Sequence, residues 1–436
     1  PIDQTEGLTG AGTVNLYHTF VLEDLGTFTG TGGTVFIRGT LTDDGSAPDD
    51  TLAIDSERSW QLNGGTIENI LITDDGDGDA AGTFLINSAD GTFDGVVLDT
   101  DTTLLNGAVV TVFYNLELLN DITLRLNRTS NFGSTSEDVQ LNFSGGVQSL
   151  HGTGTVELFS AANGTTERFL QVRPTGGGDL TIGSGITIQN TSNSYFATIG
   201  DGSLPLTIEG TIISQSTINS VHNSLRVTGS TVTNNVTLQV DADILDVNNL
   251  IGNACDSDIN GGTVELDGNY VIDQPIQVPT GGGLSLLGDW DNESIIDQTD
   301  DSLTGGGTVN LYDTFVVEDL GTFTGTGGTV FIRGTLTDDG SAPNDTLAID
   351  SERSWQLNGG TIENILITDD GDGDAAGTFL INSADGIFDG VVLDTDTTLR
   401  NGAVVTVFNN LELLNDITLR LNRTSNFGST SEDVQL

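Results

Sequence analysis

The residues best suited to chemistry are aspartates in a short loop that occurs twice. Residues 73–82 and residues 368–377 both read TDDGDGDAAG. Carboxylates at alternating positions let one loop direct several oxygen ligands at a hard cation, and calcium is the ion that we expect to bind. The loop lacks the glycine and the closing acidic residue of an EF-hand, so a solvated turn between two strands is the competing interpretation. The candidate ligands are Asp74, Asp75, Asp77 and Asp79 in the first loop and Asp369, Asp370, Asp372 and Asp374 in the second.

A second calcium candidate lies between the two loops, where residues 256–267 read DSDINGGTVELD. This segment resembles an EF-hand loop without its helices, because oxygen ligands fall at loop positions one, three, five and twelve with glycine at position six. The residues TVELD also have the composition of a strand, and aspartate reaches less far than the usual final glutamate. An ordinary β-turn is therefore the alternative. The candidate ligands are Asp256, Asp258, Asn260 and Asp267.

The two loops are duplicated because most of the chain is a tandem repeat. Residues 8–141 return as residues 303–436 with a period of 295 residues. We therefore divide the chain into a first copy at 1–141, the remainder of the period at 142–295 and a second copy at 296–436, without linkers. We also expect the chain to be a window of a longer array. The copies differ only at Ala11/Gly306, His18/Asp313, Leu22/Val317, Asp49/Asn344, Thr92/Ile387, Leu105/Arg400 and Tyr114/Asn409.

The elements that must position these residues are short strands. Runs such as TVFIRGTL at 34–41 and TVELDGNYVI at 263–272 are rich in Val, Ile, Thr and Phe, and Gly- and Asn-containing turns separate them. No long stretch has the 3.6-residue apolar period of a helix. Because no boundary interrupts the period, the pattern favours an all-β fold with almost no α-helix: one continuous right-handed parallel β-helix, or β-solenoid.

The segments GGTV at 32–35, NGGTIENI at 63–70 and GTGTVEL at 152–158 carry a family resemblance. In style the chain resembles large bacterial surface β-helix proteins of the filamentous-haemagglutinin or autotransporter-passenger type. The resemblance implies a secreted or cell-surface, rod-shaped and mostly non-catalytic protein.

An enzyme is not expected. His18, His151 and His222 are the only histidines, and His18 is replaced by aspartate in the second copy. No motif of a serine hydrolase, a metalloprotease or a P-loop protein is present. The enzymatic alternative is a calcium-dependent polysaccharide lyase, because pectate lyases share the β-helix. Arg168 and Arg173 are the close basic pair that this alternative would use, but their spacing does not follow the lyase pattern.

The charge balance restricts the partners. Twelve arginines, no lysine and sixty-three acidic residues give a formal charge of −51, which disfavours nucleic acid and anionic membranes. No segment is long and apolar enough for membrane insertion. On a rod of ~95 Å this charge would approach the axial density of duplex DNA, so condensed cations are expected.

Together these patterns predict a structural extracellular fibre or stalk. Its partners would be copies of itself, end to end or laterally, and its cofactor, if any, calcium. The alternative is an adhesin that displays glycan- or surface-binding loops, for which Trp60, Trp355 and Trp290 are candidate sugar-stacking residues and buried packing is the competing role.

Overall fold

A computed structural model describes most of the chain, in two compact units. The units comprise Pro1–Asn249 and Leu250–Leu436. The division at 141 and 295 follows the sequence copies and stays a prediction. The described residues are 2–3, 12–26, 28–29, 32–43, 45, 50–76, 82–87, 90–128, 138–160, 170–191, 196–215, 224–254, 257–299, 306–340, 345–372, 376–382, 385–400 and 402–422.

The predicted all-β class with almost no helix is confirmed. Two short 3-10 segments, η1 (Leu22–Leu25) and η3 (Glu318–Leu320), are the helical elements that the described residues offer. The strands of the first unit are β1 (Ile2–Asp3), β2 (Thr13–Leu16), β3 (Thr19–Val21), β4 (Phe28–Thr29), β5 (Thr34–Ile37), β6 (Thr40–Thr42), β7 (Asp50–Ile54), β8 (Ser59–Leu62), β9 (Thr66–Glu68), β10 (Ile70–Asp74), β11 (Phe84–Asn87), β12 (Gly91–Asp99), β13 (Thr102–Leu105), β14 (Val109–Arg128), β15 (Val139–Ser144), β16 (Gln148–Ser160), β17 (Leu170–Thr175), β18 (Leu180–Ile182), β19 (Ile186–Thr191), β20 (Phe196–Gly200), β21 (Leu206–Ile208), β22 (Thr211–Ser214), β23 (Ser224–Asn234) and β24 (Leu238–Val240).

Strand β25 (Ile244–Asn253) contains the division between the units. The strands of the second unit are β26 (Ser257–Ile259), β27 (Thr263–Ile272), β28 (Ile276–Gln277), β29 (Gly283–Asn292), β30 (Ile295–Asp297), β31 (Thr308–Leu311), β32 (Thr314–Val316), β33 (Thr322–Thr324), β34 (Thr329–Ile332), β35 (Thr335–Thr337), β36 (Asp345–Ile349), β37 (Ser354–Leu357), β38 (Thr361–Glu363), β39 (Ile365–Asp369), β40 (Phe379–Asn382), β41 (Gly386–Asp394), β42 (Thr397–Arg400), β43 (Val405–Leu413) and β44 (Leu419–Asn422).

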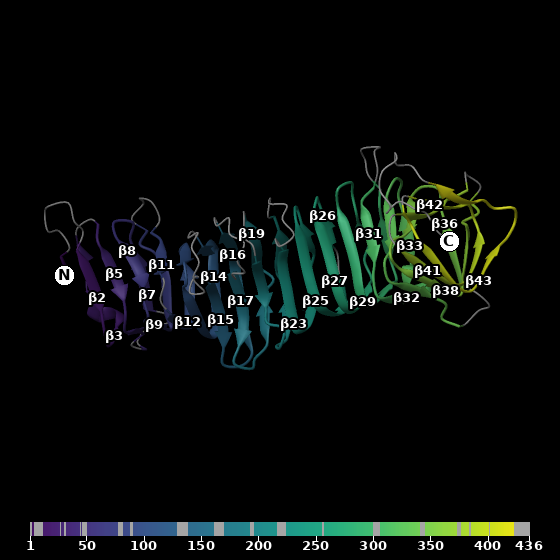
Figure 1. The fold of residues 1–436 in the computed structure, drawn as a ribbon. Helices are drawn as coiled ribbons and strands as arrows, with labels where there is room; N and C mark the ends of the chain where they lie inside the picture. The colour runs from purple at the N-terminus through teal and green to yellow at the C-terminus, as the bar shows by residue number, and fades with distance from the viewer. Residues whose placement is uncertain are drawn as a thin grey trace. The chain divides into compact units, whose positions relative to one another are not determined.

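Strands pair in parallel with strands that lie a few elements further along the chain. In the first unit β5 pairs with β8, which places Val35 beside Trp60, and β8 pairs with β11, which places Trp60 beside Phe84. All three side chains are buried, whereas their neighbours along each strand face outward. Inward columns of this kind are the core of the unit, and Figure 1 shows β5, β8 and β11 in chain order.

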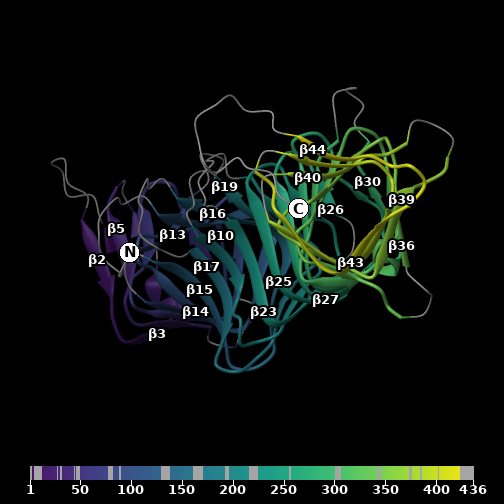
Figure 2. The ribbon, with the colours of Figure 1, turned by 45° about the vertical axis from the view of Figure 1, so that its right-hand side comes forward.

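The second unit repeats this arrangement. Strand β34 pairs with β37 so that Val330 lies beside Trp355, and β31 pairs with β34 so that Val309 lies beside Val330. In Figure 2 the strands of this unit, among them β30, β36 and β43, lie around a shared interior. The same sequence therefore forms the same strand pairs in both units.

Asparagines allow the backbone to change direction between strands. Asn69 separates β9 from β10 with φ of 54°, and its counterpart Asn364 has φ of 56°. Asparagine tolerates this left-handed conformation better than most residues. The backbone N–H of each donates to a carbonyl in the next layer, Asp94 or Asp389, at 2.7 Å.

Candidate functional site

The first aspartate of each repeated loop closes the loop. Asp74 Oδ1 accepts a hydrogen bond from the backbone N–H of Gly82, and Asp369 Oδ1 accepts one from Gly377, both at 2.9 Å. A Cβ at Gly82 would lie 2.5 Å from the carbonyl oxygen of Ile54, so only glycine fits there. These contacts support the interpretation of the loop as a sharp turn, at least at its base.

Part of the predicted metal cluster does come together. In the second unit, carboxylate oxygens of Asp370 and Asp372 lie with one of Glu352, all within 4.8 Å of one another. Glu352 comes from the turn before β37, and the sequence patterns did not single it out. Three hard oxygen donors suit calcium. Asp77, Asp79 and Asp374 lie outside the described residues.

A second acidic trio was not predicted. Glu318 of η3, Asp339 and Asp345 of β36 place carboxylate oxygens within 4.8 Å of one another. Asp345 is buried, and its Oδ2 accepts a hydrogen bond from the backbone N–H of Asp339 at 2.9 Å. These two trios are the groups that meet this criterion in the described part of the chain.

The EF-hand-like segment spreads over two strands. Asp258 lies in β26 beside Gln277, and Asp267 lies in β27 beside Leu287. Asn260 lies between these strands, and Asp256 falls outside the described residues. The remaining candidates belong to neither trio, so calcium binding here stays a prediction.

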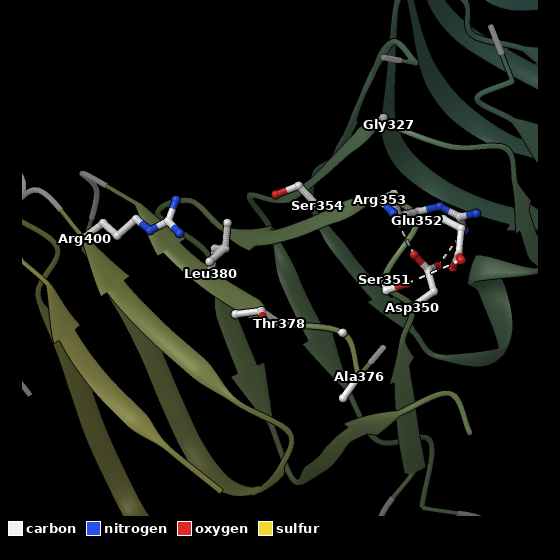
Figure 3. A pocket seen from close by; sticks show the side chains of 12 residues that line it. Gly327, Asp350, Ser351, Glu352, Arg353, Ser354, Ala376, Thr378, Leu380 and Arg400 are labelled. Atoms are coloured by element: carbon white, nitrogen blue, oxygen red, sulfur yellow. Dashed lines mark hydrogen bonds and ion pairs between the residues drawn. The ribbon is translucent and has the colours of Figure 1, made fainter. Parts of the chain in front are cut away.

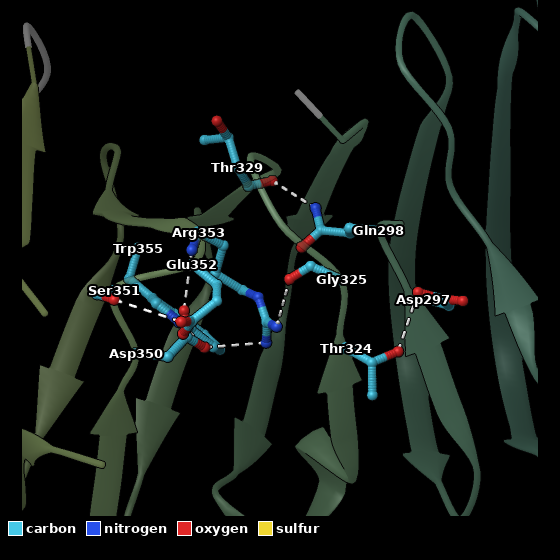
Figure 4. A network of polar contacts seen from close by, with 10 residues as sticks. All are labelled: Asp297, Gln298, Thr324, Gly325, Thr329, Asp350, Ser351, Glu352, Arg353 and Trp355. Atoms are coloured by element: carbon cyan, nitrogen blue, oxygen red, sulfur yellow. Dashed lines mark hydrogen bonds and ion pairs between the residues drawn. The ribbon is translucent and has the colours of Figure 1, made fainter. Parts of the chain in front are cut away.

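The most ordered polar feature is the turn Asp350–Arg353, which holds a buried ion pair. Arg353 Nη1 lies 2.9 Å from Asp350 Oδ2, with 6% and 13% of the two side chains exposed. Asp350 also accepts the backbone N–H of Arg353 at 2.9 Å, and Arg353 Nη2 donates to the carbonyl of Gly325 at 3.2 Å (Figure 4). Burial lowers the pKa of Arg353, and Asp350 counteracts that effect.

The same turn occurs in the first unit. Arg58 forms an ion pair with Asp55, and its guanidinium lies over the ring of Phe28 at 5.5 Å, as that of Arg353 lies over Phe323 at 5.9 Å. Each phenylalanine packs edge-on against the tryptophan that follows, with centroid distances of 5.1 Å to Trp60 and 5.4 Å to Trp355. Arginine, phenylalanine and tryptophan therefore form one packed unit in each copy.

The tryptophans are packing residues. Trp60, Trp290 and Trp355 are 2%, 3% and 3% exposed, so the buried role weighed from the sequence is confirmed. Beside them lie two equivalent hollows of about 300 Å³ and about 340 Å³, which Trp60 and Trp355 line together with their ion pairs.

A third hollow, of about 390 Å³, lies on the other side of the Asp350–Arg353 turn and has a polar lining (Figure 3). Arg353, Arg400 and Glu352 are the charged residues of its lining besides Asp350. Arg400 belongs to β42 and is one of the seven positions at which the copies differ. Its contribution was not foreseen, although the difference itself was visible in the sequence.

Surface aspartates are satisfied mainly by neutral donors. Asn120 Nδ2 donates to Asp99 Oδ1 and Asn415 Nδ2 donates to Asp394 Oδ1, each at 2.8 Å and 21 residues apart. Hydrogen bonds to a carboxylate stabilise its charged form. For Asp297, burial alone would raise the pKa, but hydrogen bonds from Thr299 and Thr324 outweigh it and the pKa is lowered.

Of the candidate lyase pair, Arg173 lies in the described part of the chain. Arg173 donates to Asn142 Oδ1 at 2.9 Å and to Gln140 Oε1 at 3.1 Å, while Arg168 lies outside the described residues. His151 lies 3.8 Å from Glu117 on a half-exposed surface.

No known protein family, curated protein or solved structure matches the chain. Among the residues that the structure describes, no helix has the length and apolar character to cross a membrane.

Proposed function

We propose that the chain is a right-handed parallel β-helix that serves as the scaffold of an extracellular fibre, in the manner of bacterial surface β-helix proteins. Parallel pairing between successive layers supports this architecture, as do the inward columns typified by Val35, Trp60 and Phe84. Such a column can be extended by any segment that continues the pattern. The function is therefore mechanical, and no single site carries it.

The observation that carries the proposal is that equivalent leucines are buried where a further described strand pairs with their own, and exposed where the described residues supply no such strand. Leu118 and Leu126 of β14 are 0% exposed, whereas their counterparts Leu413 and Leu421 are 49% and 54% exposed. In the first unit β16 covers this edge, with Leu126 beside Leu158. The sequence of residues 405–422 is thus suited to accept a further strand layer.

At the N-terminal edge of the repeat, the second copy is the more buried of the two. Val309 and Leu311 of β31 are fully buried because β29 pairs with that strand. Their counterparts Val14 and Leu16 in β2 are only half-buried. Among the described strands, each copy therefore has one edge that pairs with a further layer and one edge that does not.

These two uncovered edges differ from each other, so a contact between them would be heterologous. A heterologous contact joins different surfaces of identical molecules and forms open filaments when its rotation does not close into a ring. Unpaired strand edges supply backbone hydrogen-bonding groups, and the exposed leucines supply apolar area. The partner that we propose is a second copy of the chain, joined end to end.

Cations would be needed for such an assembly, because each chain carries a formal charge of −51. Stacking copies brings like charges together, and condensed or bound cations reduce this repulsion. The Glu352 trio is the group that we expect to bind calcium, with Glu318, Asp339 and Asp345 as the second candidate.

The test is the concentration dependence of self-association, measured by analytical ultracentrifugation and electron microscopy in 0.15 M salt with calcium. The wild-type chain should form filaments, and Leu413→Lys with Leu421→Lys should abolish them. The matched control places lysines on outward positions of the same region, at Thr406 and Thr418, and should leave assembly intact. A wild-type chain that stays monomeric at every concentration, or equal assembly of both variants, would refute the proposal.

A further inference from the structure

The hollow beside the Asp350–Arg353 turn is the feature of the second unit that is best suited to hold a small ligand. Its volume of about 390 Å³ falls within the usual range for ligand pockets. Besides its charged groups, it is lined by the hydroxyl-bearing residues Ser351, Ser354 and Thr378. Figure 3 shows Arg400 on β42 and Arg353 in the turn before β37.

The side chain of Arg400 makes no hydrogen bond or ion pair with the described residues, and its Nε is buried without a partner. This is unexpected in a chain with twelve arginines and sixty-three acidic residues, where a carboxylate partner is easily supplied. Arg226, for comparison, pairs with Asp246 at 2.9 Å. A buried N–H without a partner costs free energy, which an incoming acceptor would recover.

The other arginine of the hollow is already neutralised. Arg353 is held by Asp350, although its Nε also lacks a partner, and Glu352 is the remaining carboxylate of the lining. At 0.15 M ionic strength, charges beyond about 8 Å are largely screened, so the distant acidic surface contributes little. The aspartates beside Glu352, Asp370 and Asp372, do not line the hollow, so Arg400 is the guanidinium of its lining that has no carboxylate bound to it.

The first copy of the repeat provides an internal comparison. Eleven of the twelve lining residues have identical counterparts there, and the single difference is Leu105 in place of Arg400. Leucine cannot bind an anion. The substitution thus adds one guanidinium to an otherwise shared polar surface.

We propose that this hollow binds the carboxylate of a small acidic sugar, a uronic acid, with Arg400 as the principal contact. Guanidinium groups bind carboxylates through paired charge-assisted hydrogen bonds. The serine and threonine hydroxyls and the carboxylate of Glu352 match the hydroxyl groups of a sugar ring. The proposal adds a ligand to the scaffold and does not depend on fibre formation.

The experiment is a ligand-observed NMR titration of the full chain with sodium glucuronate. Two further ligands separate the contributions: glucuronamide keeps the hydroxyls and lacks the charge, and acetate keeps the carboxylate and lacks the ring. Arg400→Leu restores the residue of the first copy and should fold normally, which circular dichroism checks. Arg420→Leu removes the same charge from an exposed position and serves as the control.

We expect glucuronate to bind the wild-type chain and the Arg420→Leu variant equally, and the Arg400→Leu variant at least about tenfold more weakly. Glucuronamide and acetate should each bind more weakly than glucuronate. The proposal is overturned if glucuronate does not bind the wild-type chain, if Arg400→Leu binds it equally well, or if either analogue matches it.

Discussion

Leu118 and Leu413 stand at equivalent positions of the two sequence copies, yet the first is fully buried and the second is 49% exposed. The difference arises from the strand layer that follows. Strand β16 covers this part of β14, where Leu116 lies beside Leu150. Local sequence is the same in both places, so burial here is a property of the neighbouring layer.

This relationship predicts unequal effects of the same substitution. Leu118→Ala should lower the free energy of unfolding by about 2–5 kcal/mol because it leaves a cavity in a packed core. Leu413→Ala removes a half-exposed side chain and should cost well below that in the unassociated protein. Urea unfolding at low protein concentration measures both, and similar shifts in the two midpoints would contradict the assignment of covered and uncovered edges.

The Asp350–Arg353 pair predicts a second asymmetry. Asp350→Asn leaves the buried guanidinium of Arg353 without its counter-charge and should cost about 3–5 kcal/mol. Replacing both residues, by Asn and Met, should cost less than Asp350→Asn alone, because no uncompensated charge remains. Thermal unfolding of both variants tests this, with the exposed Asp258→Asn as a control. If the double variant is less stable than Asp350→Asn, an uncompensated charge on Arg353 is not the cause of the destabilisation.

Asp243 predicts a pH dependence. Burial raises its pKa to about 7, and its Oδ2 is buried without a hydrogen-bond partner. The unfolded chain binds fewer protons at this group than the folded chain between pH 4 and pH 7, so its contribution to stability falls as the pH rises through that window. Asp243→Asn should therefore raise the unfolding midpoint at pH 8 relative to the wild-type chain, with a smaller relative gain at pH 4. Asparagine also suits the φ of 68° at this position. An equal shift at both pH values would disprove the titration.

Calcium should stabilise the second unit through the Glu352 trio. Adding calcium should raise the unfolding midpoint of the wild-type chain, and a chelator should reverse the effect. Glu352→Gln or Asp372→Asn should weaken calcium binding in isothermal titration calorimetry, because each removes one of three clustered carboxylates. Unchanged calorimetric binding in both variants would place any calcium elsewhere.

The all-β class with almost no helix could be predicted from the sequence because its signals are local. Val- and Thr-rich runs such as residues 34–41 and 263–272 form strands as expected, and 3-10 turns are the helical structure among the described residues. The pairing partners could not be predicted. Strands in successive layers pair residues 18 to 34 apart, and irregular turn lengths hide that spacing in the sequence.

The candidate sites show the same limit. The carboxylates of Asp370 and Asp372, two of the alternating aspartates, do lie close together, but their neighbour Glu352 comes from another part of the chain and was not predicted. Asp74 was predicted as a ligand from its type alone, whereas its position at the loop base makes it a hydrogen-bond acceptor for Gly82. The difference between Leu105 and Arg400 was visible in the sequence, but only the structure shows that Arg400 lines a hollow.

The central claim is that parallel layers of strand stack directly upon one another. Cryo-electron microscopy at a resolution that separates strands about 4.8 Å apart tests it most directly. The account predicts parallel strands with Trp60 lying between Val35 and Phe84 in one inward column. A map with antiparallel hairpins in separate globular modules, and Trp60 outside such a column, would contradict it.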